Sequence, residues 1–325
     1  MGLAKIVVLY ALRVFGVFVL ARWLTRRGLR IVCWHGIAQD DEHLFRPSLF
    51  MTPDALRSRI DWLKRKGFPV LGLHEAVRGL KDGSLPPAAT VLTFDDGWAS
   101  WRNAAPIFHG FPVTGYVMSC YLDRPEPIFN LFAQYAYWKS GQDRLTTHLG
   151  TLSYPELWGE ARKLSFDDRA ALLPEIAASA GVDLDRIADD RRFSLLSSAE
   201  LRELGWDVQL HTHLHEWSAD PVRVAREIRL NAAHLEPAAR SPLTHFCYPA
   251  GEYYQENFSI LTTLGILSAT TCERRFNYPG DNPLALGRFL DHSAVPQIVF
   301  EAAMSGVFEI LRRVENSCSR VVRAG

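Results

Sequence analysis

Short apolar runs alternate with segments of helical periodicity along most of the chain. The runs are rich in β-branched and aromatic residues and stop at turn-forming residues, which predicts strands. The expected strands cover residues 30–35, 68–73, 89–94, 113–120, 207–210, 244–248, 265–271 and 285–290. Because helical segments separate them, the pattern indicates a parallel sheet, and seven or eight such units indicate closure into a barrel. The sequence therefore predicts an α/β barrel.

Helix signals lie between the strands. The clearest is Thr52 followed by Pro53, an N-cap and a first-turn proline, with Gly67 where the helix stops. Helices are expected over 53–66, 74–80, 199–204 (capped by Ser197 or Ser198), 221–235 and 297–314, the last packing on the barrel. Residues 121–195 are helical and aromatic, and we interpret them as an insertion into the barrel, not as a second catalytic domain.

The amino terminus differs in kind from the rest of the chain. Residues 6–20 are almost wholly apolar apart from Arg13. A cluster of arginines follows at Arg22, Arg26, Arg27 and Arg30. A membrane span needs about 20 apolar residues, so this shorter, charged stretch predicts an interfacial helix or a marginal span. A cleaved signal peptide and an ordinary core helix are the alternatives.

These features divide the chain into three parts. We expect a membrane-associating segment at 1–29, a barrel at 30–295 and a C-terminal helix and tail at 296–325. The arginines after the apolar segment favour the cytoplasmic face of a membrane, with the periplasmic or extracellular face as the alternative. The membrane surface is therefore a predicted partner.

Composition narrows the class of protein. The 325 residues are 48% hydrophobic, enough for a sizeable core. Basic and acidic residues balance at 36 each, so no global field indicates nucleic acid as a partner. The five cysteines lack the close spacing of a zinc site or disulfide framework: Cys33, Cys120, Cys247, Cys272 and Cys318. Free thiols and a reducing compartment are expected.

Two polar motifs each follow an apolar run. Thr93-Phe94-Asp95-Asp96-Gly97 ends the strand expected at 89–94, and His211-Thr212-His213-Leu214-His215 follows the strand at 207–210. The C-terminal ends of parallel strands collect at one edge of a sheet, so the two motifs can converge. An isolated Asp-Asp-Gly is more often a helix cap, but the paired histidine motif favours a hydrolytic metal site.

With these motifs the chain resembles the polysaccharide deacetylases, carbohydrate esterase family 4, also called the NodB-homology domain. The first motif matches the family's TFDDG, and His211-Thr212-x-x-His215 matches its H-[ST]-x-x-H. The likeness covers roughly residues 30–291 and is poorest over 121–194. It implies a deformed barrel of seven or eight (β/α) units that removes N-acetyl groups from amino sugars.

The resemblance also implies roles for the motif residues. Asp96, His211 and His215 would bind a divalent ion, most simply Zn²⁺, with Co²⁺ or Ni²⁺ as alternatives, and would leave positions open for water and substrate. Asp95 would be the general base for the metal-bound water. The family pattern passes over His213, which we expect to support the site or lie at the surface.

The general acid of the family is a histidine, usually on an apolar strand ending L-x-H near the C-terminus. We expect no such strand late in this chain. Instead, the strand at 31–35 ends in His35, which is similar to the circularly permuted branch that contains biofilm exopolysaccharide deacetylases. His35 would then protonate the leaving amine. The alternative is a buried histidine bonded to a backbone carbonyl.

The chain departs from the family at its third motif. Cys247 replaces an arginine that orients the base, and Ala250 replaces an aromatic residue. The Ala250 backbone N–H, next to Tyr248, can still stabilise an oxyanion. Arg288, at another expected strand end, is a candidate replacement for the arginine, although an exposed arginine or a core ion pair is equally consistent. Glu252 and Asp291 are weaker candidates.

The sequence thus predicts a metal-dependent N-deacetylase. Its expected substrate is an N-acetylated polysaccharide or a lipid-linked sugar at a membrane face. Two alternatives stay open. One is a catalytically impaired carbohydrate-binding or scaffold protein on the same fold, and the other is a deformylase of a lipid-linked sugar.

Overall fold

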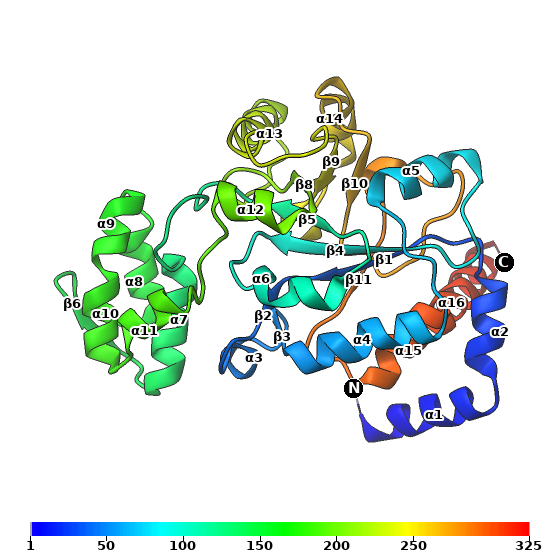
Figure 1. Ribbon diagram of the computed structural model, residues 1–325, viewed down its shortest axis with the longest axis horizontal. Coiled ribbons are helices and arrows are strands. Elements are labelled where there is room, and N and C mark those ends of the chain that lie inside the picture. The colour runs from blue at the N-terminus through cyan, green and yellow to red at the C-terminus, as the bar shows by residue number, and fades with distance from the viewer. Residues whose placement is uncertain (1, 325) are drawn as a thin grey trace.

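The structure is a computed structural model that describes residues 2–324, with side chains as far as Glu315. Its centre is a seven-stranded parallel sheet in the order β10-β9-β8-β5-β4-β1-β11 (Figure 1). The strands are β1 (Arg30–Trp34), β4 (Thr90–Asp96), β5 (Thr114–Val117), β8 (Asp207–Leu210), β9 (His245–Cys247), β10 (Ser268–Thr270) and β11 (Phe289–Leu290). Short strands β2 (Gly36–Ile37) and β3 (Phe50–Met51) pair beside it.

One late stretch contacts both edges of this sheet. Leu286 forms a parallel bridge to Thr270 of β10, and three residues later Phe289 of β11 pairs with Val32 of β1. The sheet therefore curls round on itself, and the predicted deformed α/β barrel is confirmed. β8 has its predicted bounds and β4 extends past its expected end to Asp96, whereas the regular pairing of β5, β9, β10 and β11 is shorter than the expected runs.

The central strands are buried on both faces. Every residue of β1 and of β4 is buried, including both aspartates that end β4. Strands covered by helices on both sides have near-continuous apolar sequences, which explains why these runs were conspicuous in the sequence. It also means that any polar group at a strand end is placed by a rigid element.

The strand expected at 68–73 does not form. Only Val70 makes an isolated bridge, to Thr90 at the start of β4. Pro69 has no N–H to donate, and the chain turns at Gly72 into α5 (Leu73–Asp82), so a ladder cannot extend in either direction. The prediction of a strand here was wrong.

Most expected helices form close to their predicted bounds. Thr52 caps α4 (Pro53–Arg65), accepting a 3.3 Å hydrogen bond from the Ala55 N–H. Ser197 caps α12 (Ser198–Leu204) in a capping box. The other helices of the barrel are α3 (Glu42–Phe45), α6 (Trp101–Ala104), α13 (Pro221–Leu235) and α14 (Phe258–Thr263).

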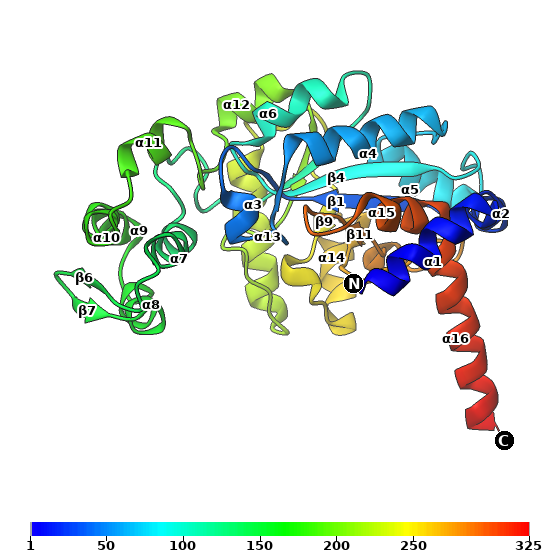
Figure 2. The same ribbon diagram turned by 90° about the horizontal axis from the view of Figure 1, so that it is seen from below.

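Residues 121–195 form a lobe beside the C-terminal ends of the strands (Figures 1 and 2). The lobe contains α7 (Phe129–Ser140), the hairpin β6 (Leu145–Thr147) and β7 (Gly150–Leu152), α8 (Tyr154–Ala161), α9 (Phe166–Ala171), α10 (Leu173–Ala180) and α11 (Leu184–Asp189). Buried Arg192 ties it to the barrel through 2.6 Å hydrogen bonds to Asp41 and Glu42. The lobe is thus held against the edge where the polar motifs lie.

The apolar amino terminus forms two helices instead of one. α1 (Leu3–Val14) and α2 (Val17–Leu24) meet at Gly16, whose φ of +75° favours glycine, and their axes differ by 79°. Among the described residues no single helix is long and apolar enough to cross a membrane, whereas this bent pair passes that test by length and composition alone.

The predicted C-terminal helix is also divided. α15 (Gln297–Ser305) and α16 (Val307–Ala324) are separated by Gly306, with φ of +89°. A Cβ atom there would lie 2.2 Å from Thr25 Oγ1, so only glycine allows this close approach. The cysteines whose side chains are described are free, at Cys33, Cys120, Cys247 and Cys272, and Cys318 lies outside the described side chains.

Candidate active site

The two polar motifs meet at the C-terminal edge of the sheet. Asp96 is the last residue of β4, and His211 follows β8, which is separated from β4 only by β5. The Asp96 Oδ1 atom lies 3.3 Å from His211 Nε2 and 3.4 Å from His215 Nε2. The predicted convergence of carboxylate and imidazoles is therefore present in the fold.

Other groups fix the orientation of these side chains. The His211 Nδ1 atom lies 2.8 Å from the Cys247 carbonyl oxygen, which directs its Nε2 toward Asp96. Trp98 Nε1 donates a 2.9 Å hydrogen bond to Asp96 Oδ2 and leaves Oδ1 facing the imidazoles. Metal-binding histidines and carboxylates in proteins are usually held by such outer hydrogen bonds.

Three groups of described residues have ligand atoms close enough to share an ion. They are Asp96-His211-His215, Asp95-His211-Cys247 and Cys33-His35-Asp95. The last two depend on Asp95, whose two carboxylate oxygens already accept hydrogen bonds from Arg288. Only the first group offers one carboxylate oxygen and two imidazole nitrogens without a competing cation, a donor set that suits a catalytic divalent metal.

Asp95 and Arg288 form a buried bidentate ion pair. Both hydrogen bonds are 2.8 Å, and both residues are at most 2% exposed. Burial alone would raise the pKa of Asp95, but the Arg288 charge and its hydrogen bonds hold this pKa well below its usual value. The Cys247 thiol lies 3.1 Å from Arg288 Nη2, so the arginine and the cysteine occupy adjoining space.

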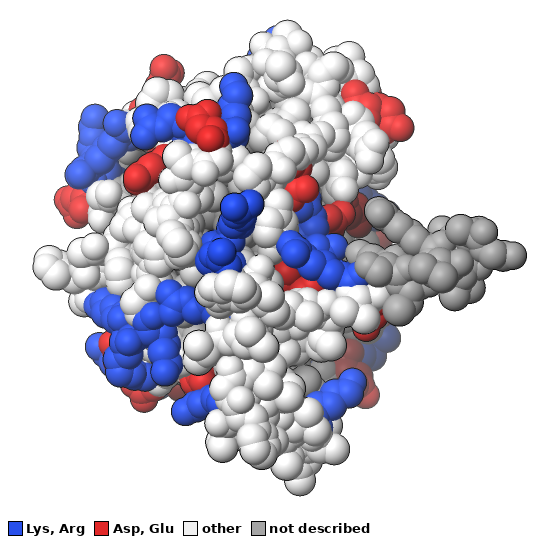
Figure 3. All heavy atoms as spheres, turned by 90° about the vertical axis from the view of Figure 1, so that its right-hand side faces the viewer, with Lys and Arg blue, Asp and Glu red and all other residues white. Residues whose placement is uncertain are grey.

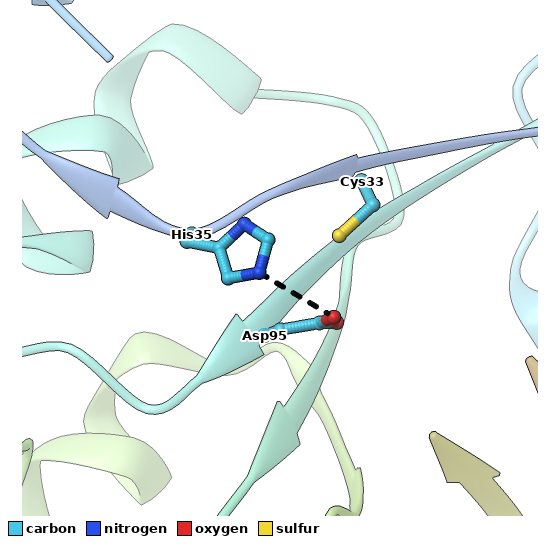
Figure 4. Close-up of side chains that lie close together, drawn as sticks. All are labelled: Cys33, His35 and Asp95. Atoms are coloured by element: carbon cyan, nitrogen blue, oxygen red, sulfur yellow. Dashed lines mark ion pairs between the residues drawn. The ribbon is translucent and has the colours of Figure 1, made fainter. Parts of the chain in front are cut away.

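His35 is a further neighbour of Asp95, in addition to Arg288. Its side chain, 19% exposed, follows β1 and points toward the carboxylate, as Figure 4 shows together with Cys33. The distance from His35 Nε2 to Asp95 Oδ2 is 3.9 Å. The sequence placed His35 at a strand end near the carboxylates, and the structure has it there.

A second histidine was missed. We expected no late strand ending L-x-H, but β11 runs directly into Leu290-Asp291-His292. Because β11 pairs with β1, His292 and His35 follow neighbouring strands. Burial lowers the pKa of His292, and the His35 charge acts in the same direction. The strand expected at 285–290 contains β11, but the Leu290-x-His292 pattern at its end was overlooked.

The weaker candidate Asp291 has a structural partner. Its carboxylate accepts hydrogen bonds of 2.9 Å from Arg59 Nε and 3.0 Å from Trp34 Nε1. These bonds join the residue after β11 to α4 and β1. Asp291 therefore supports the strand ends that carry His35 and His292.

His213 does not contribute to the Asp96 cluster. Its Nδ1 atom lies 3.0 Å from Ser119 Oγ, and its ring stacks on His234 at 4.9 Å between centroids. Glu227 accepts hydrogen bonds from the backbone N–H groups of His213 and Leu214. These contacts hold the loop that carries His215.

The third-motif residues lie beside the site in different environments. The Tyr248 side chain is fully buried, and its hydroxyl donates a 2.8 Å hydrogen bond to the Leu284 carbonyl. Ala250 has a φ of +55°, a strained value for a residue with a Cβ atom. The Tyr248 side chain thus points into the core, whereas Ala250 lies in the tight turn that follows β9.

Strained backbone is concentrated around this site. Eight non-glycine residues within the described chain have positive φ, and four of them belong to the motifs: Asp96, Thr212, His215 and Ala250. Such conformations cost about 1–3 kcal/mol each and persist where the surrounding structure imposes them, often at active sites. Here they direct Asp96 and His215 toward a common point.

Solved structures share this arrangement of elements. The chain is similar to IcaB from Ammonifex degensii, with a TM-score of 0.57 and 19% identity over 86% of this chain and 97% of the other. A de-N-acetylase from Aggregatibacter actinomycetemcomitans aligns with a TM-score of 0.56 and 15% identity over 85% and 99% of the two chains. The chain has the polysaccharide deacetylase fold. The deacetylase PplD of Streptococcus pyogenes, in complex with acetate, aligns with a TM-score of 0.55 and 17% identity over 85% and 98%.

A curated relative agrees with this family. The chain is 32% identical over 104 residues to the poly-beta-1,6-N-acetyl-D-glucosamine N-deacetylase of Escherichia coli K12. The match covers 30% of this chain and spans only 15% of the length of that relative. No family model matches the chain. The resemblance to the polysaccharide deacetylases that the two motifs indicated is confirmed.

Proposed function

We propose that the protein is a metal-dependent N-deacetylase that hydrolyses the N-acetyl group of an amino sugar in a polysaccharide. The observation that carries this proposal is the convergence of Asp96, His211 and His215 on one point, beside a second carboxylate, Asp95, that is held ionised. The likeness to polysaccharide deacetylases supports the amide as the bond attacked.

Different residues of the chain have different proposed roles in the hydrolysis. A divalent ion held by Asp96, His211 and His215 would supply a nucleophilic water of lowered pKa and polarise the acyl oxygen. Asp95 would be the base for the attacking water, and Arg288 keeps the Asp95 carboxylate ionised and fixed in orientation. This arrangement makes Arg288 the functional substitute for the arginine that Cys247 replaces.

His35 completes the proposed acid–base pair. The leaving amine must be protonated, and His35 lies near Asp95 on a separate strand, so it can act from another side of the scissile bond. The backbone N–H of Ala250, in the turn after β9, is the proposed donor to the oxyanion. His292, after the adjoining strand, is the alternative acid.

Release of acetate tests the proposal. The purified chain with added zinc or cobalt should release acetate from N-acetylated oligosaccharides, and Asp95→Asn should abolish this release. Asp54→Asn, an exposed carboxylate in the first turn of α4, is the matched control and should have wild-type activity. Formate in place of acetate would identify a deformylase. Glycan binding that is unchanged in Asp95→Asn, with no acid released, would identify a scaffold.

We also propose that the α1–α2 corner binds a membrane surface. Val14 and Phe15 at the bend are 82% and 83% exposed, and α2 exposes further apolar side chains along its length. Residues 1–39 contain no Asp or Glu. Figure 3 faces this side of the molecule and shows an uncharged ridge with basic residues beside it. Apolar insertion with a basic border fits an anionic lipid surface.

The position of this corner bears on the substrate. α2 ends at Leu24, shortly before β1 begins at Arg30, whereas His35 follows the last residue of β1. Five residues of strand span roughly 17 Å, so the two features lie at opposite edges of the sheet (Figure 1). This separation favours a glycan that extends away from the membrane as the substrate, in preference to a sugar linked directly to lipid. The face of the membrane on which the protein acts stays a prediction.

A further inference from the structure

A cavity of about 650 Å³ connects the site to the inserted lobe. Asp96 and His215 line one end, and α8 and α9 line the other through Trp158 and Phe166. This volume lies in the range of pockets that enclose small organic ligands. The lobe, the part of the chain least like the family in sequence, therefore forms a wall of the space next to the scissile bond.

Three arginines line this cavity: Arg46, Arg162 and Arg169. Among the ion pairs of the described residues, none joins these three side chains to a carboxylate. Arg46 donates a hydrogen bond to the neutral Gln134 amide. Arg169 lies over the Phe166 ring, 4.5 Å from its centroid, and Arg162 is an exposed side chain at the end of α8.

Unlike these three arginines, a neighbouring arginine outside the cavity lining is paired with carboxylates. Arg124, close by, is held by Glu126 and Asp167 at 3.0 and 2.8 Å. The acidic residues that line the cavity are Asp96, which belongs to the proposed metal site, and Glu216, which follows His215. Two of the three arginines come from the lobe, and none of the lining carboxylates does, which gives this end of the cavity a positive field.

We propose that the cavity binds a glycan that carries an oxyanion group, a phosphate or a carboxylate, near the acylated amino sugar. Guanidinium groups recognise both oxyanions through paired N–H donors. The aromatic and amide side chains beside them, Tyr121, Trp158 and Asn130, suit the neutral faces and hydroxyls of the sugar rings. The inference rests on the proposed function and adds the charge of the substrate to it.

Binding of matched sugars to the zinc-loaded full chain tests this inference. The probes are N-acetylglucosamine 1-phosphate, an N-acetylglucosamine–glucuronic acid disaccharide and the neutral N,N′-diacetylchitobiose, followed by the fluorescence of cavity tryptophans such as Trp158. At least one anionic sugar should bind ten times more tightly than the neutral one, and added salt should reduce the difference. Which anionic probe binds better identifies phosphate or carboxylate as the group.

Arginine variants distinguish binding of the anionic group by the cavity arginines from binding of that group by the metal. Arg162→Ala/Arg169→Ala should lose the preference for the anionic sugar, and Arg162→Lys/Arg169→Lys should retain part of it. Arg186→Ala, a matched exposed arginine on α11 outside the cavity, should keep all of it. A preference for the anionic sugar that survives unchanged in the double alanine variant would overturn the inference.

Acetate release, measured in parallel on a neutral N-acetylated oligosaccharide, separates the two proposals. Equal binding of anionic and neutral sugars together with acetate release would overturn the substrate charge and leave the deacetylase standing. If none of the sugars binds and no acetate is released, both proposals are overturned.

Discussion

Arg288 donates two hydrogen bonds of 2.8 Å to the carboxylate of Asp95, although 193 residues separate them in the chain. Cys247, at the position where the family has an arginine, lies 3.1 Å from the same guanidinium group. The small thiol leaves space that the Arg288 side chain occupies from the neighbouring segment before β11. Arg288 therefore brings a positive charge to Asp95 from a segment far along the chain.

Removing Arg288 should be costly. Arg288→Ala leaves Asp95 buried without its counter-charge, which typically destabilises a fold by about 3–5 kcal/mol. Urea unfolding should show this loss, and kcat should fall with it. In Arg288→Ala/Asp95→Asn the loss of stability should be clearly smaller, because no buried charge is left unpaired. Equal losses in the single and double variants would show that the pair is not coupled.

The two strand-end histidines can be distinguished by kinetics. His35→Gln should reduce kcat about 10²- to 10⁴-fold with little effect on KM, as expected for loss of a general acid. His292→Gln, its matched control on the adjoining strand, should change kcat by less than tenfold. The reverse result would assign the acid to His292 and correct the role given to His35.

His245 should make stability depend on pH. This first residue of β9 is 1% exposed, and burial lowers its pKa to about 4, with the charge of Asp207 opposing and His74 adding to the effect. The folded state therefore keeps His245 neutral at pH 5, where the unfolded chain binds a proton. The contribution of neutral His245 to the free energy of unfolding should be complete above about pH 6.5. It should then fall by up to roughly 3 kcal/mol as the pH is lowered toward 4.

A variant isolates this contribution from the other titrating groups. His245→Gln retains a group that can hydrogen-bond Ser268 Oγ, which lies 2.8 Å from His245 Nδ1, but does not titrate. Chemical unfolding at several pH values should show a flatter dependence between pH 6.5 and 4 in this variant. Parallel curves for the two proteins would show that His245 is not the source.

Membrane binding should depend on the α1–α2 corner. Val14→Asp/Phe15→Asp should keep the full chain in the supernatant when anionic vesicles are sedimented, because two charges would enter the apolar region. Val222→Asp, a 75% exposed apolar residue on α13, is the matched control and should still sediment. Sedimentation of the corner variant at the wild-type level would place the membrane contact elsewhere.

The sequence predicted those elements in which local and tertiary preferences agree. Helix α13 has the predicted bounds because Asp220 caps it, Pro221 begins it and its apolar face is regular. The convergence of Asp96 with His211 could be predicted because both follow strands of one parallel sheet, which share a C-terminal edge. Arg288 could be named only as one candidate, because the sequence does not show that its side chain reaches Asp95.

The remaining features depend on three-dimensional contacts. Pro69, Gly72 and Gly16 are local signals for the lost strand at 68–73 and for the bend in the apolar run 6–20, but a glycine or proline alone does not fix where an element stops. His292 was missed although the strand before it was expected at 285–290, because the Leu290-x-His292 signal just past its end was not recognised. The arginines of the cavity come from separate segments and become neighbours of one space only in the folded chain.

Metal binding tests the central claim most directly. Crystals of the full chain grown with zinc should show one anomalous peak at about 2.0–2.2 Å from Asp96, His211 and His215, and the peak should be absent in Asp96→Asn but present in His213→Ala. No peak at these three side chains, or a peak among Cys33, His35 and Asp95 instead, would contradict the account of a hydrolytic metal centre.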